Sequence, residues 1–352
     1  MAERRIRIGF VGVGNMGQAA HLRNYAMLPE CEVVAIAEVR PGLAARVAQR
    51  YGVPRVYSNA TEMLAHERLD GIVAAQPYTQ HGQLITPLYA AGLPILTEKP
   101  LASSVAVGEQ MVAALQEGGS WHMLGYHKRS DPATQYARRE IDRLRQSGEL
   151  GAPRYVRIIM PDGDWIAGGF DELIRSDEPA PSPSVDPPDA AMDAATFNAY
   201  SAFVNYYIHQ VNLLRYLLGE PYHVTYADPS GVLLAAQSAS GVAGTIEMAP
   251  YRTTLDWREA ALVAFEHGYI KLELPAPLAY ARPGRVEILR DPGQGVAPEI
   301  VTPVLPPIHA MRQQAMNFLA AIKGERRPPC EAAEALDDLR VARDYLRLWR
   351  HG

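Results

Sequence analysis

A glycine-rich turn near the start of the chain is the first stretch whose residue types and spacing could do chemistry. A short apolar run leads directly into Gly12-Val13-Gly14-Asn15-Met16-Gly17, which has the spacing Gly-x-Gly-x-x-Gly. The run is typical of a buried strand, and the glycines are typical of the turn into a helix. Gly12 permits a tight turn, Gly14 lets the backbone approach a pyrophosphate, and Gly17 lets the helix pack closely on the strand. The pattern predicts a phosphate site at the positive end of that helix.

An acidic residue after a second apolar run supports the same chemistry. Val33-Val34-Ala35-Ile36-Ala37 closes on Glu38, which lies 21 residues after Gly17 (38 − 17). A carboxylate near this separation holds the ribose hydroxyls of NAD and repels the 2′-phosphate of NADP. Arg40 lies two residues further on and could soften that repulsion. The pattern favours NAD and leaves use of both dinucleotides open.

A parallel sheet is needed to position these residues, and the chain up to about residue 125 has the pattern of one. Apolar runs alternate with amphipathic helices, which is typical of a doubly wound α/β sheet. The helices predicted after the glycine turn are Pro41–Tyr51, Thr61–His66, Gln83–Ala91 and Ser104–Glu117, and further strands are Gly71–Ala75, Leu93–Thr97 and Trp121–Gly125.

The pattern changes after residue 125, where strands follow one another without intervening helices. Such strands predict a mostly antiparallel sheet. The predicted strands are Arg154–Met160, His223–Tyr226, Gly231–Gln237, Gly241–Met248, Ala260–Phe265 and Tyr269–Leu274, with a hairpin turn at Glu266-His267-Gly268; the predicted helices are Thr134–Gln146, Ala202–Leu218, Ala310–Lys323 and Ala332–Trp349. The proline-rich, acidic segment Asp171–Asp189 cannot be a regular element, and either a linker or a lid fits it.

Composition excludes several classes of protein. A chain of 352 residues favours two domains, and 48% hydrophobic with 21% charged residues is ordinary for a globular protein. The net charge of −5 gives no reason to expect nucleic acid or membrane as a partner. No run approaches a spanning helix or a signal peptide, so we expect a cytoplasmic protein. Cys31 and Cys330 are too few for a disulfide framework, and no spacing indicates a metal site.

The order of motifs resembles that of the glucose-fructose oxidoreductase / inositol dehydrogenase (Gfo/Idh/MocA) family, over nearly the whole chain. The matching stretches are the glycine turn, Pro77-Tyr78-Thr79-Gln80-His81, Glu98-Lys99-Pro100, Gly125-Tyr126-His127-Lys128-Arg129-Ser130-Asp131-Pro132 and Ile208-His209-Gln210-Val211-Asn212-Leu213-Leu214-Arg215-Tyr216-Leu217-Leu218-Gly219. The resemblance implies an NAD-binding Rossmann domain at 1–125, a substrate-binding and oligomerisation α/β domain with a large, mostly antiparallel open sheet at 126–330, and a C-terminal helix at 331–352. It also implies a homo-oligomer, dimer or tetramer, and an active site between the domains.

The resemblance assigns catalysis to a lysine and a histidine. Lys99 would bind the reacting hydroxyl, and His209 would accept its proton or share that role with the lysine. Relatives usually carry a carboxylate one helical turn before this histidine, where this chain has Asn205, and many carry an aspartate where it has Asn212. An amide cannot take a proton, although it can hydrogen-bond. Its presence favours neutral Lys99 and His209, so a neutral lysine could itself be the base.

Further residues are predicted to surround the two ligands. The cofactor residues are Gly12, Gly14, Asn15, Met16, Gly17, Glu38, Arg40, Gln76, Pro77, His81, Glu98 and Lys99, and the substrate residues are Lys99, Tyr126, Lys128, Arg129, Asp164, Trp165, Asn205, Tyr206 and His209. If Lys128 or Arg129 points inward, the substrate carries a carboxylate, sulfonate or phosphate; otherwise they are a solvated basic pair. Asp164 and Trp165 could accept a hydroxyl and stack on a sugar ring. His81 shapes the cofactor loop or caps it, and Tyr206 and Tyr207 line the site or pack.

On the helix predicted over Ala202–Leu218, Asn205, His209 and Asn212 fall at i, i+4 and i+7 and form one polar row. Such a row favours a face that lines a cavity.

The sequence leaves three functions open. The first is an NAD-dependent oxidoreductase acting on a secondary hydroxyl of a sugar, polyol or related cyclic compound. The second is an NAD-dependent glycoside hydrolase that oxidises its substrate transiently and regenerates NAD in each cycle. The third is a dinucleotide or sugar sensor without catalysis, which only the missing aspartate supports.

Overall fold

The computed structural model describes residues 4–180, 184–293 and 295–351, and its contacts divide the chain into two compact units. The first unit combines Met1–Tyr126, Gly169–Phe197 and Gln314–Leu339. The second combines His127–Gly168, Asn198–Gln313 and Arg340–Gly352.

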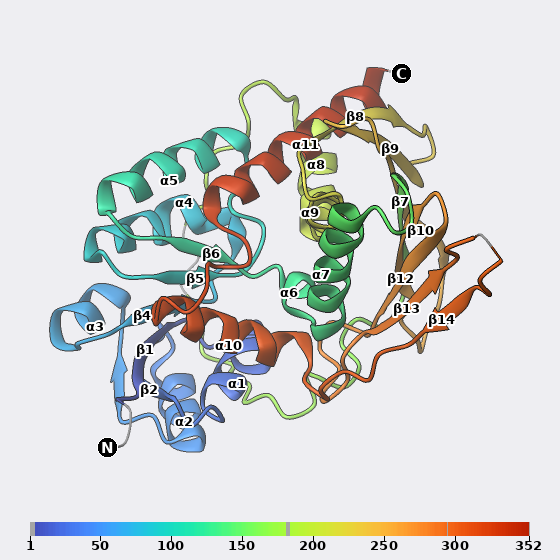
Figure 1. Ribbon diagram of the computed structural model, residues 1–352. Coiled ribbons are helices and arrows are strands. Elements are labelled where there is room, and N and C mark those ends of the chain that lie inside the picture. Colours follow the sequence, from blue (N-terminus) through green and yellow to red (C-terminus); the bar gives the residue numbers. More distant parts are fainter. Residues whose placement is uncertain (1–3, 181–183, 294, 352) are drawn as a thin grey trace. The chain divides into compact units, whose positions relative to one another are not determined.

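A parallel sheet forms the centre of the first unit (Figure 1). Its strands are β1 (Ile6–Val11), β2 (Cys31–Ala37), β3 (Arg55–Tyr57), β4 (Gly71–Ala74), β5 (Ile95–Thr97) and β6 (His122–Leu124), in the order β3-β2-β1-β4-β5-β6. Every pairing between them is parallel, which confirms the predicted doubly wound sheet. The order reverses between β1 and β4, and ligands of such sheets bind outside the carboxyl ends of the strands at this point.

The helices of the first unit follow the capping signals of the sequence. α2 (Pro41–Tyr51) ends at Gly52, and the Ser104 side chain caps α5 (Val105–Gly118). The other helical elements are η1 (Gly17–Leu22), α1 (Arg23–Tyr25), α3 (Ala60–His66), η2 (Tyr78–Gln80), α4 (His81–Leu84) and η3 (Thr86–Ala91). The single helix predicted over Gln83–Ala91 is wrong: α4 and η3 share this stretch, because Pro87 has no N–H with which to continue a helix.

Residues near the C-terminus complete the core of the first unit. α10 (Ala310–Ile322) places Phe318 against Tyr25 and Trp121, with ring centroids 6.4 and 5.5 Å apart. Tyr25 packs in turn on Phe10 of β1, at 5.4 Å. The division observed therefore differs from the one drawn from the sequence, since residues 314–339 pack with the first sheet and α11 (Ala332–His351) is not a separate part.

The second unit is built on a large, mostly antiparallel sheet, as the sequence predicted. Its strands are β7 (Pro153–Asp162), β8 (Tyr222–Ala227), β9 (Leu233–Ser238), β10 (Ala243–Arg252), β11 (Glu259–Phe265), β12 (Gly268–Leu274), β13 (Arg285–Arg290) and β14 (Glu299–Val301), in the order β14-β13-β12-β11-β7-β10-β9-β8. Only the pairing of β7 with β10 is parallel among these described strands. The hairpin at Glu266-His267 joins β11 to β12 as predicted, whereas β13 and β14 were not predicted.

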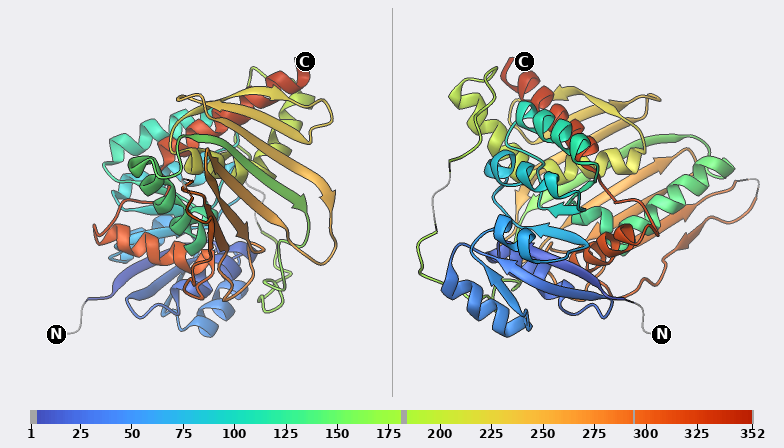
Figure 2. Two further views of the ribbon diagram at one scale, coloured as in Figure 1. Left: turned by 45° about the vertical axis from the view of Figure 1, so that its right-hand side comes forward. Right: turned by 90° about the vertical axis from the view of Figure 1, so that its left-hand side faces the viewer.

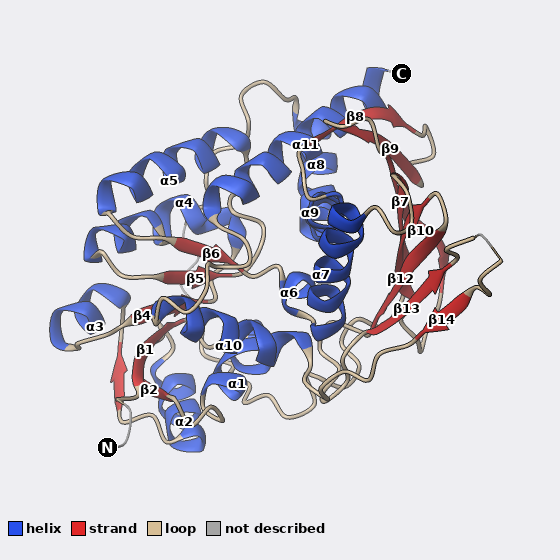
Figure 3. Cartoon of the chain, viewed as in Figure 1, coloured by secondary structure: helices blue, strands red, loops and turns tan. Residues whose placement is uncertain are grey.

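Four helices lie wholly or partly in the second unit: α6 (His127–Ser130), α7 (Pro132–Ser147), α8 (Ala194–Tyr206) and α9 (Ile208–Leu218). α7 and α9 lie along one face of its sheet (Figures 1 and 3).

The single helix predicted over Ala202–Leu218 is wrong. The chain forms α8 and α9 instead, with Tyr207 between them at φ −95° and ψ −3°. No glycine or proline marks this break. The rings of Phe203 and Tyr206 pack on Tyr207, with centroids 5.8 and 5.0 Å away. The predicted polar row is therefore divided, with Asn205 on α8 and His209 and Asn212 on α9.

The described residues of Asp171–Asp189 form no helix or strand, as predicted; residues 181–183 lie outside the described chain. In the right-hand view of Figure 2 this yellow-green segment runs beside the helices of the first unit. Among the described residues, no helix combines the length and the apolar character that a membrane span requires.

Candidate active site

The glycine turn after β1 has a backbone that larger residues would disturb. Gly12 has a φ of +85°, in the left-handed region, and a Cβ on Gly17 would lie 2.5 Å from the Gly12 carbonyl oxygen. A Cβ on Gly14 would find its nearest neighbour 3.8 Å away, in Arg40. Asn15 and Met16 begin the helix that continues as η1, and the Met16 side chain makes no capping hydrogen bond. The backbone at Gly12, Gly14 and Gly17 fits a dinucleotide, whose pyrophosphate needs close approach at Gly14 beside a helix N-terminus.

Glu38, the residue after β2, contacts this turn and is buried. Its Oε2 accepts the Val13 N–H at 3.0 Å, and its Oε1 accepts Nε of Arg40 at 2.7 Å. The hydrogen bond to Glu38 raises the pKa of the Arg40 guanidinium. A carboxylate oxygen has more than one lone pair, so Glu38 can also accept ribose hydroxyls. The residues therefore fit NAD at this position.

His81 joins the loops that follow β4 and β5. Its ring is fully buried, with Nδ1 at 3.0 Å from the Leu101 carbonyl oxygen and Nε2 at 3.1 Å from that of Gln76. Burial lowers the pKa of His81. Gln76 is half-buried and Pro77 exposed at the start of this loop. The contacts favour a loop-shaping role for His81.

Glu98, just after the end of β5, contacts η1, the helix that follows the glycine turn. His21 Nε2 lies 2.7 Å from Glu98 Oε1. Burial raises the pKa of Glu98, but the hydrogen bond from His21 and the positive charges of His21 and Lys99 outweigh it, so the pKa lies below its usual value. An ionised Glu98 thus stands beside Lys99, which is half-buried at the carboxyl end of β5.

The predicted basic pair of the second unit has protein partners. The Lys128 ammonium pairs with Glu259 in a site where both side chains are buried, and it lies 5.5 Å from the Trp257 ring centroid. Glu259 also accepts Nε2 of Gln210 at 2.7 Å. The Lys128 ammonium is therefore paired with a carboxylate of the protein, whereas the sequence alone left it available for an anionic substrate.

Arg129 is held in a similar way. Its Nε donates to Asn212 Oδ1 at 2.5 Å, and its guanidinium lies 4.8 Å from the Tyr216 ring centroid. Asn212 is buried, and its amide oxygen accepts the hydrogen bond from Arg129. The cavity-lining face of Asn205, His209 and Asn212 stays a prediction.

Other predicted substrate residues differ in exposure. Asn205 is exposed at the end of α8, and His209 is half-buried in the first turn of α9, with its ring 4.7 Å from and nearly perpendicular to that of His127. Tyr206 donates to Asp162 Oδ1 at 3.1 Å. Lys99 belongs to the first unit, and Asn205 and His209 belong to the second. The pairing of the lysine with the histidine stays a prediction of the resemblance.

Asp164 has a local structural role, and two further predicted residues are at least half-buried. Oδ1 of Asp164 accepts the N–H groups of Ile166 and Ala167, both at 3.0 Å, so it closes its own turn. Trp165 is half-buried in that turn, and Tyr126 is buried at the end of the first unit.

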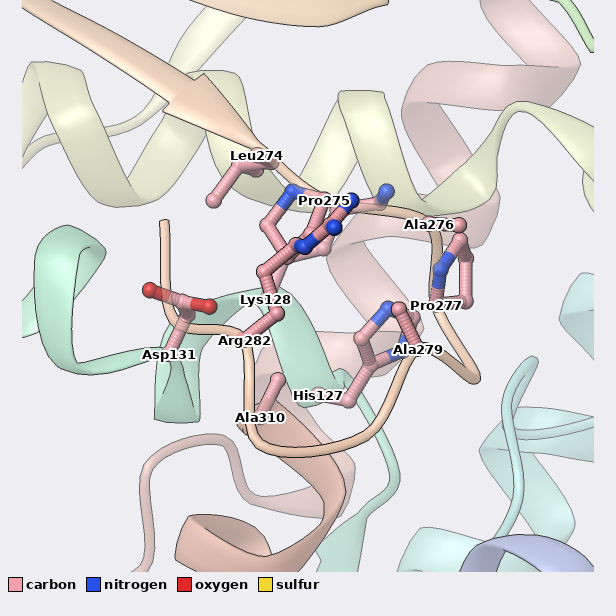
Figure 4. A pocket seen from close by; sticks show the side chains of 10 residues that line it. All are labelled: His127, Lys128, Asp131, Leu274, Pro275, Ala276, Pro277, Ala279, Arg282 and Ala310. Atoms are coloured by element: carbon pink, nitrogen blue, oxygen red, sulfur yellow. The ribbon is translucent and has the colours of Figure 1, made fainter. Parts of the chain in front are cut away.

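A small hollow opens beside α6 in the second unit (Figure 4). Its lining includes His127, Lys128, Asp131 and Arg282. Burial raises the pKa of Asp131 to about 6, although the backbone N–H groups of Ala133 and Gly284 oppose this. Neither Asn205 nor His209 lines this hollow. It was not predicted, and its walls come from segments far apart in the sequence.

Sequence reasoning also missed Gln18, Glu178, Gln210 and Glu259. Gln18 directly follows the glycine motif, and its side chain binds the backbone of Ile174. Its position next to the motif could have drawn attention to it. The two glutamates carry no local signal, because Gly42, which Glu178 binds, and Lys128, which Glu259 binds, each lie more than 100 residues away. Among the described residues, no three His, Cys, Asp or Glu side chains gather as a metal site would require.

Comparisons with known proteins agree with the first unit's fold. Residues 6–126 match a family model, GFO_IDH_MocA, described as "Oxidoreductase family, NAD-binding Rossmann fold". The scyllo-inositol 2-dehydrogenase (NAD(+)) of Bacillus subtilis (strain 168) is 26% identical over 262 residues, which cover 70% of this chain and 67% of that protein. The Myo-inositol 2-dehydrogenase of Thermotoga maritima is 23% identical over 247 residues, or 69% of this chain and 63% of that protein. The alignments thus span about two thirds of these curated relatives.

A solved structure covers more of the chain. The aldose-aldose oxidoreductase from Caulobacter crescentus, complexed with glycerol, matches 99% of this chain and 98% of its own with a TM-score of 0.71. Its sequence identity is 19%, so this likeness shows a shared fold.

Two glycine substitutions separate stability from cofactor binding. Gly17→Ala places a methyl group 2.5 Å from the Gly12 carbonyl and should lower the melting temperature markedly. Gly14→Ala has room for its methyl group, so its melting temperature should stay near that of the wild type, while NADH affinity falls at least about tenfold. Thermal unfolding and calorimetric titration with NADH measure the two effects. Full NADH affinity in Gly14→Ala would contradict the predicted phosphate position.

Glu98→Gln should lower the free energy of unfolding by about 1.5–3 kcal/mol at neutral pH, because it removes the negative charge of a carboxylate that accepts a hydrogen bond from His21. The pKa of Glu98 is lower in the folded protein than its unfolded value near 4.5. The stabilisation is therefore fully present above that value and is lost as pH falls through the folded pKa. Urea unfolding of both proteins between pH 4 and 7 should give a difference that grows up to about pH 5 and then stays constant. A difference that does not change with pH would overturn this assignment.

Proposed function

We propose that the chain is a member of the Gfo/Idh/MocA oxidoreductase family and that it is an NAD-dependent dehydrogenase. It would move a hydride to or from a secondary hydroxyl of a sugar, a polyol or a related cyclic compound. The observation that carries the proposal is the glycine turn at Gly12–Gly17, with its close backbone approaches, and the buried Glu38 that accepts the Val13 N–H. The inositol dehydrogenases among its relatives supply the substrate class.

The residues divide the work of alcohol oxidation. NAD, when bound, accepts the hydride. The hydroxyl must lose its proton as its carbon loses the hydride, so a base within hydrogen-bond reach lowers the barrier. Lys99 would hold the hydroxyl oxygen, His209 would take the proton, and Asn205 with Tyr206 would orient neighbouring hydroxyls.

The contacts of the basic pair favour a neutral substrate. Lys128 is paired with Glu259, and Arg129 is held by Asn212 and Tyr216. A substrate anion would have to displace a buried carboxylate from Lys128, which is unfavourable. We therefore propose inositols and neutral sugars as the first compounds to test, ahead of acids and phosphates.

Lys99→Ala should lower kcat/KM by roughly 10²- to 10⁴-fold, the usual contribution of a group that assists proton transfer. NADH affinity should fall much less than kcat/KM, since the glycine turn and Glu38 are untouched. Lys271→Ala is the matched control, because this lysine pairs with Glu273 on β12 and lies outside the proposed site. Near-normal turnover of Lys99→Ala would overturn the assignment.

The assay should follow absorbance of reduced nicotinamide with NAD across inositols, sugars and glycosides, and should measure product release in parallel. NADH that accumulates with an inositol or a sugar supports the dehydrogenase. Glycoside cleavage that requires NAD and leaves no NADH would replace it with the redox-neutral hydrolase.

We further propose that the protein is cytoplasmic and forms a dimer or tetramer, as the family resemblance implies. Gel filtration should then give a mass of at least twice the 38.6 kDa of one chain. Elution at the mass of a single chain would contradict this.

A further inference from the structure

Residues 172–178 form an anchored segment on the first unit, beside the predicted cofactor residues. The Gln18 side chain donates to the Ile174 carbonyl and accepts the Ile174 N–H, both at 3.0 Å. Arg46 donates to the Arg175 carbonyl at 2.8 Å, and Arg50 donates to that of Glu172 at 2.6 Å. Hydrogen bonds therefore hold the segment against η1, the helix that follows the glycine turn, and against α2.

Within this segment, Glu178 caps the N-terminus of α2. Its Oε1 accepts the Gly42 N–H at 2.9 Å, and its Oε2 accepts the Leu43 N–H at 2.8 Å. Its Oε2 also accepts Oγ of Ser176 at 2.8 Å. The hydrogen bond from Gly42, together with those from Ser176 and Leu43, holds the pKa of Glu178 below its usual range. An ionised carboxylate therefore occupies the positive end of this helix.

The position of this carboxylate matters because α2 follows Glu38 almost directly. Glu38 marks where the ribose hydroxyls would lie, so a phosphate on the 2′ oxygen would come close to Arg40 and to the first N–H groups of α2. Both of these groups, the Arg40 guanidinium and the first N–H groups of α2, already have partners in the protein. Arg40 binds Glu38 at 2.7 Å, and Glu178 accepts the N–H groups of Gly42 and Leu43.

We propose that Glu178 determines dinucleotide specificity, excluding the 2′-phosphate of NADP from the N-terminus of α2. The inference rests on the proposed use of NAD. It adds Glu178, from a distant segment, to Glu38 as a second acidic residue that disfavours the 2′-phosphate. It also gives the acidic segment a role that a plain linker would not have.

The decisive variant is Glu178→Gln, which keeps the shape of the side chain and removes its charge. The other ties of the segment, through Gln18, Arg46 and Arg50, remain in place. Glu172→Gln is the matched control: Glu172 lies in the same segment, but it pairs with Arg50 in the last turn of α2, at the opposite end of the helix.

Calorimetric titration with NADH and with NADPH tests the proposal without turnover. The wild type should bind NADH at least about a hundredfold more tightly than NADPH. Glu178→Gln should gain at least about tenfold in NADPH affinity with NADH affinity within about twofold, and Glu172→Gln should match the wild type. Adding Arg40→Ala to Glu178→Gln should remove the gain, since Arg40 would then be the phosphate's partner.

The possible failures can be told apart. An unchanged NADPH affinity in Glu178→Gln, with NADH binding normal, would overturn this inference and leave the proposed dehydrogenase intact. Equal gains in Glu172→Gln would also overturn it, since they would point to general loosening of the segment. A wild type that binds neither dinucleotide would overturn the proposed function and this inference together.

Discussion

The first unit depends on how backbone N–H groups at the starts of its helices find acceptors. Helices that follow parallel strands begin at the carboxyl edge of the sheet, and their first N–H groups have no partner within the helix. The chain supplies Glu178 at α2 and Asp186 at α4, where Asp186 accepts the Gly82 N–H at 2.8 Å. At the glycine turn the Met16 side chain makes no cap, and Glu38 accepts the N–H of Val13, ahead of the helix. The first N–H groups of this helix are the ones to which the proposed function assigns a dinucleotide phosphate.

Local patterns predicted what local chemistry decides. Gly52, Gly148 and Gly219 end their helices in left-handed conformations, as a glycine after an amphipathic run implies. The glycine turn could also be predicted, because φ at Gly12 and the close approach at Gly17 follow from residue type and spacing. The mostly antiparallel sheet followed from strands that have no helices between them.

Features set by distant contacts could not be predicted. Phe318 completes a core around Tyr25 almost 300 residues earlier, and no local pattern near Phe318 indicates this. Nothing in the spacing of Asn212 from His209 indicates that Arg129 on α6 donates to its amide oxygen. The break at Tyr207 accompanies aromatic packing without a glycine or a proline. In each case a tertiary partner decided the outcome, and the sequence placed that partner far away.

Glu98 bears on the proposed division of labour between Lys99 and a separate base. The sequence alone left room for a neutral Lys99 acting as the base, because an amide stands where relatives carry a carboxylate. The structure supplies a different carboxylate: Glu98, ionised and bonded to His21, directly precedes Lys99 in the chain. A neighbouring negative charge stabilises an ammonium group, which can donate hydrogen bonds but cannot accept a proton. A charged Lys99 would polarise the hydroxyl oxygen, and the proton would then have to leave through another group, for which His209 is the candidate.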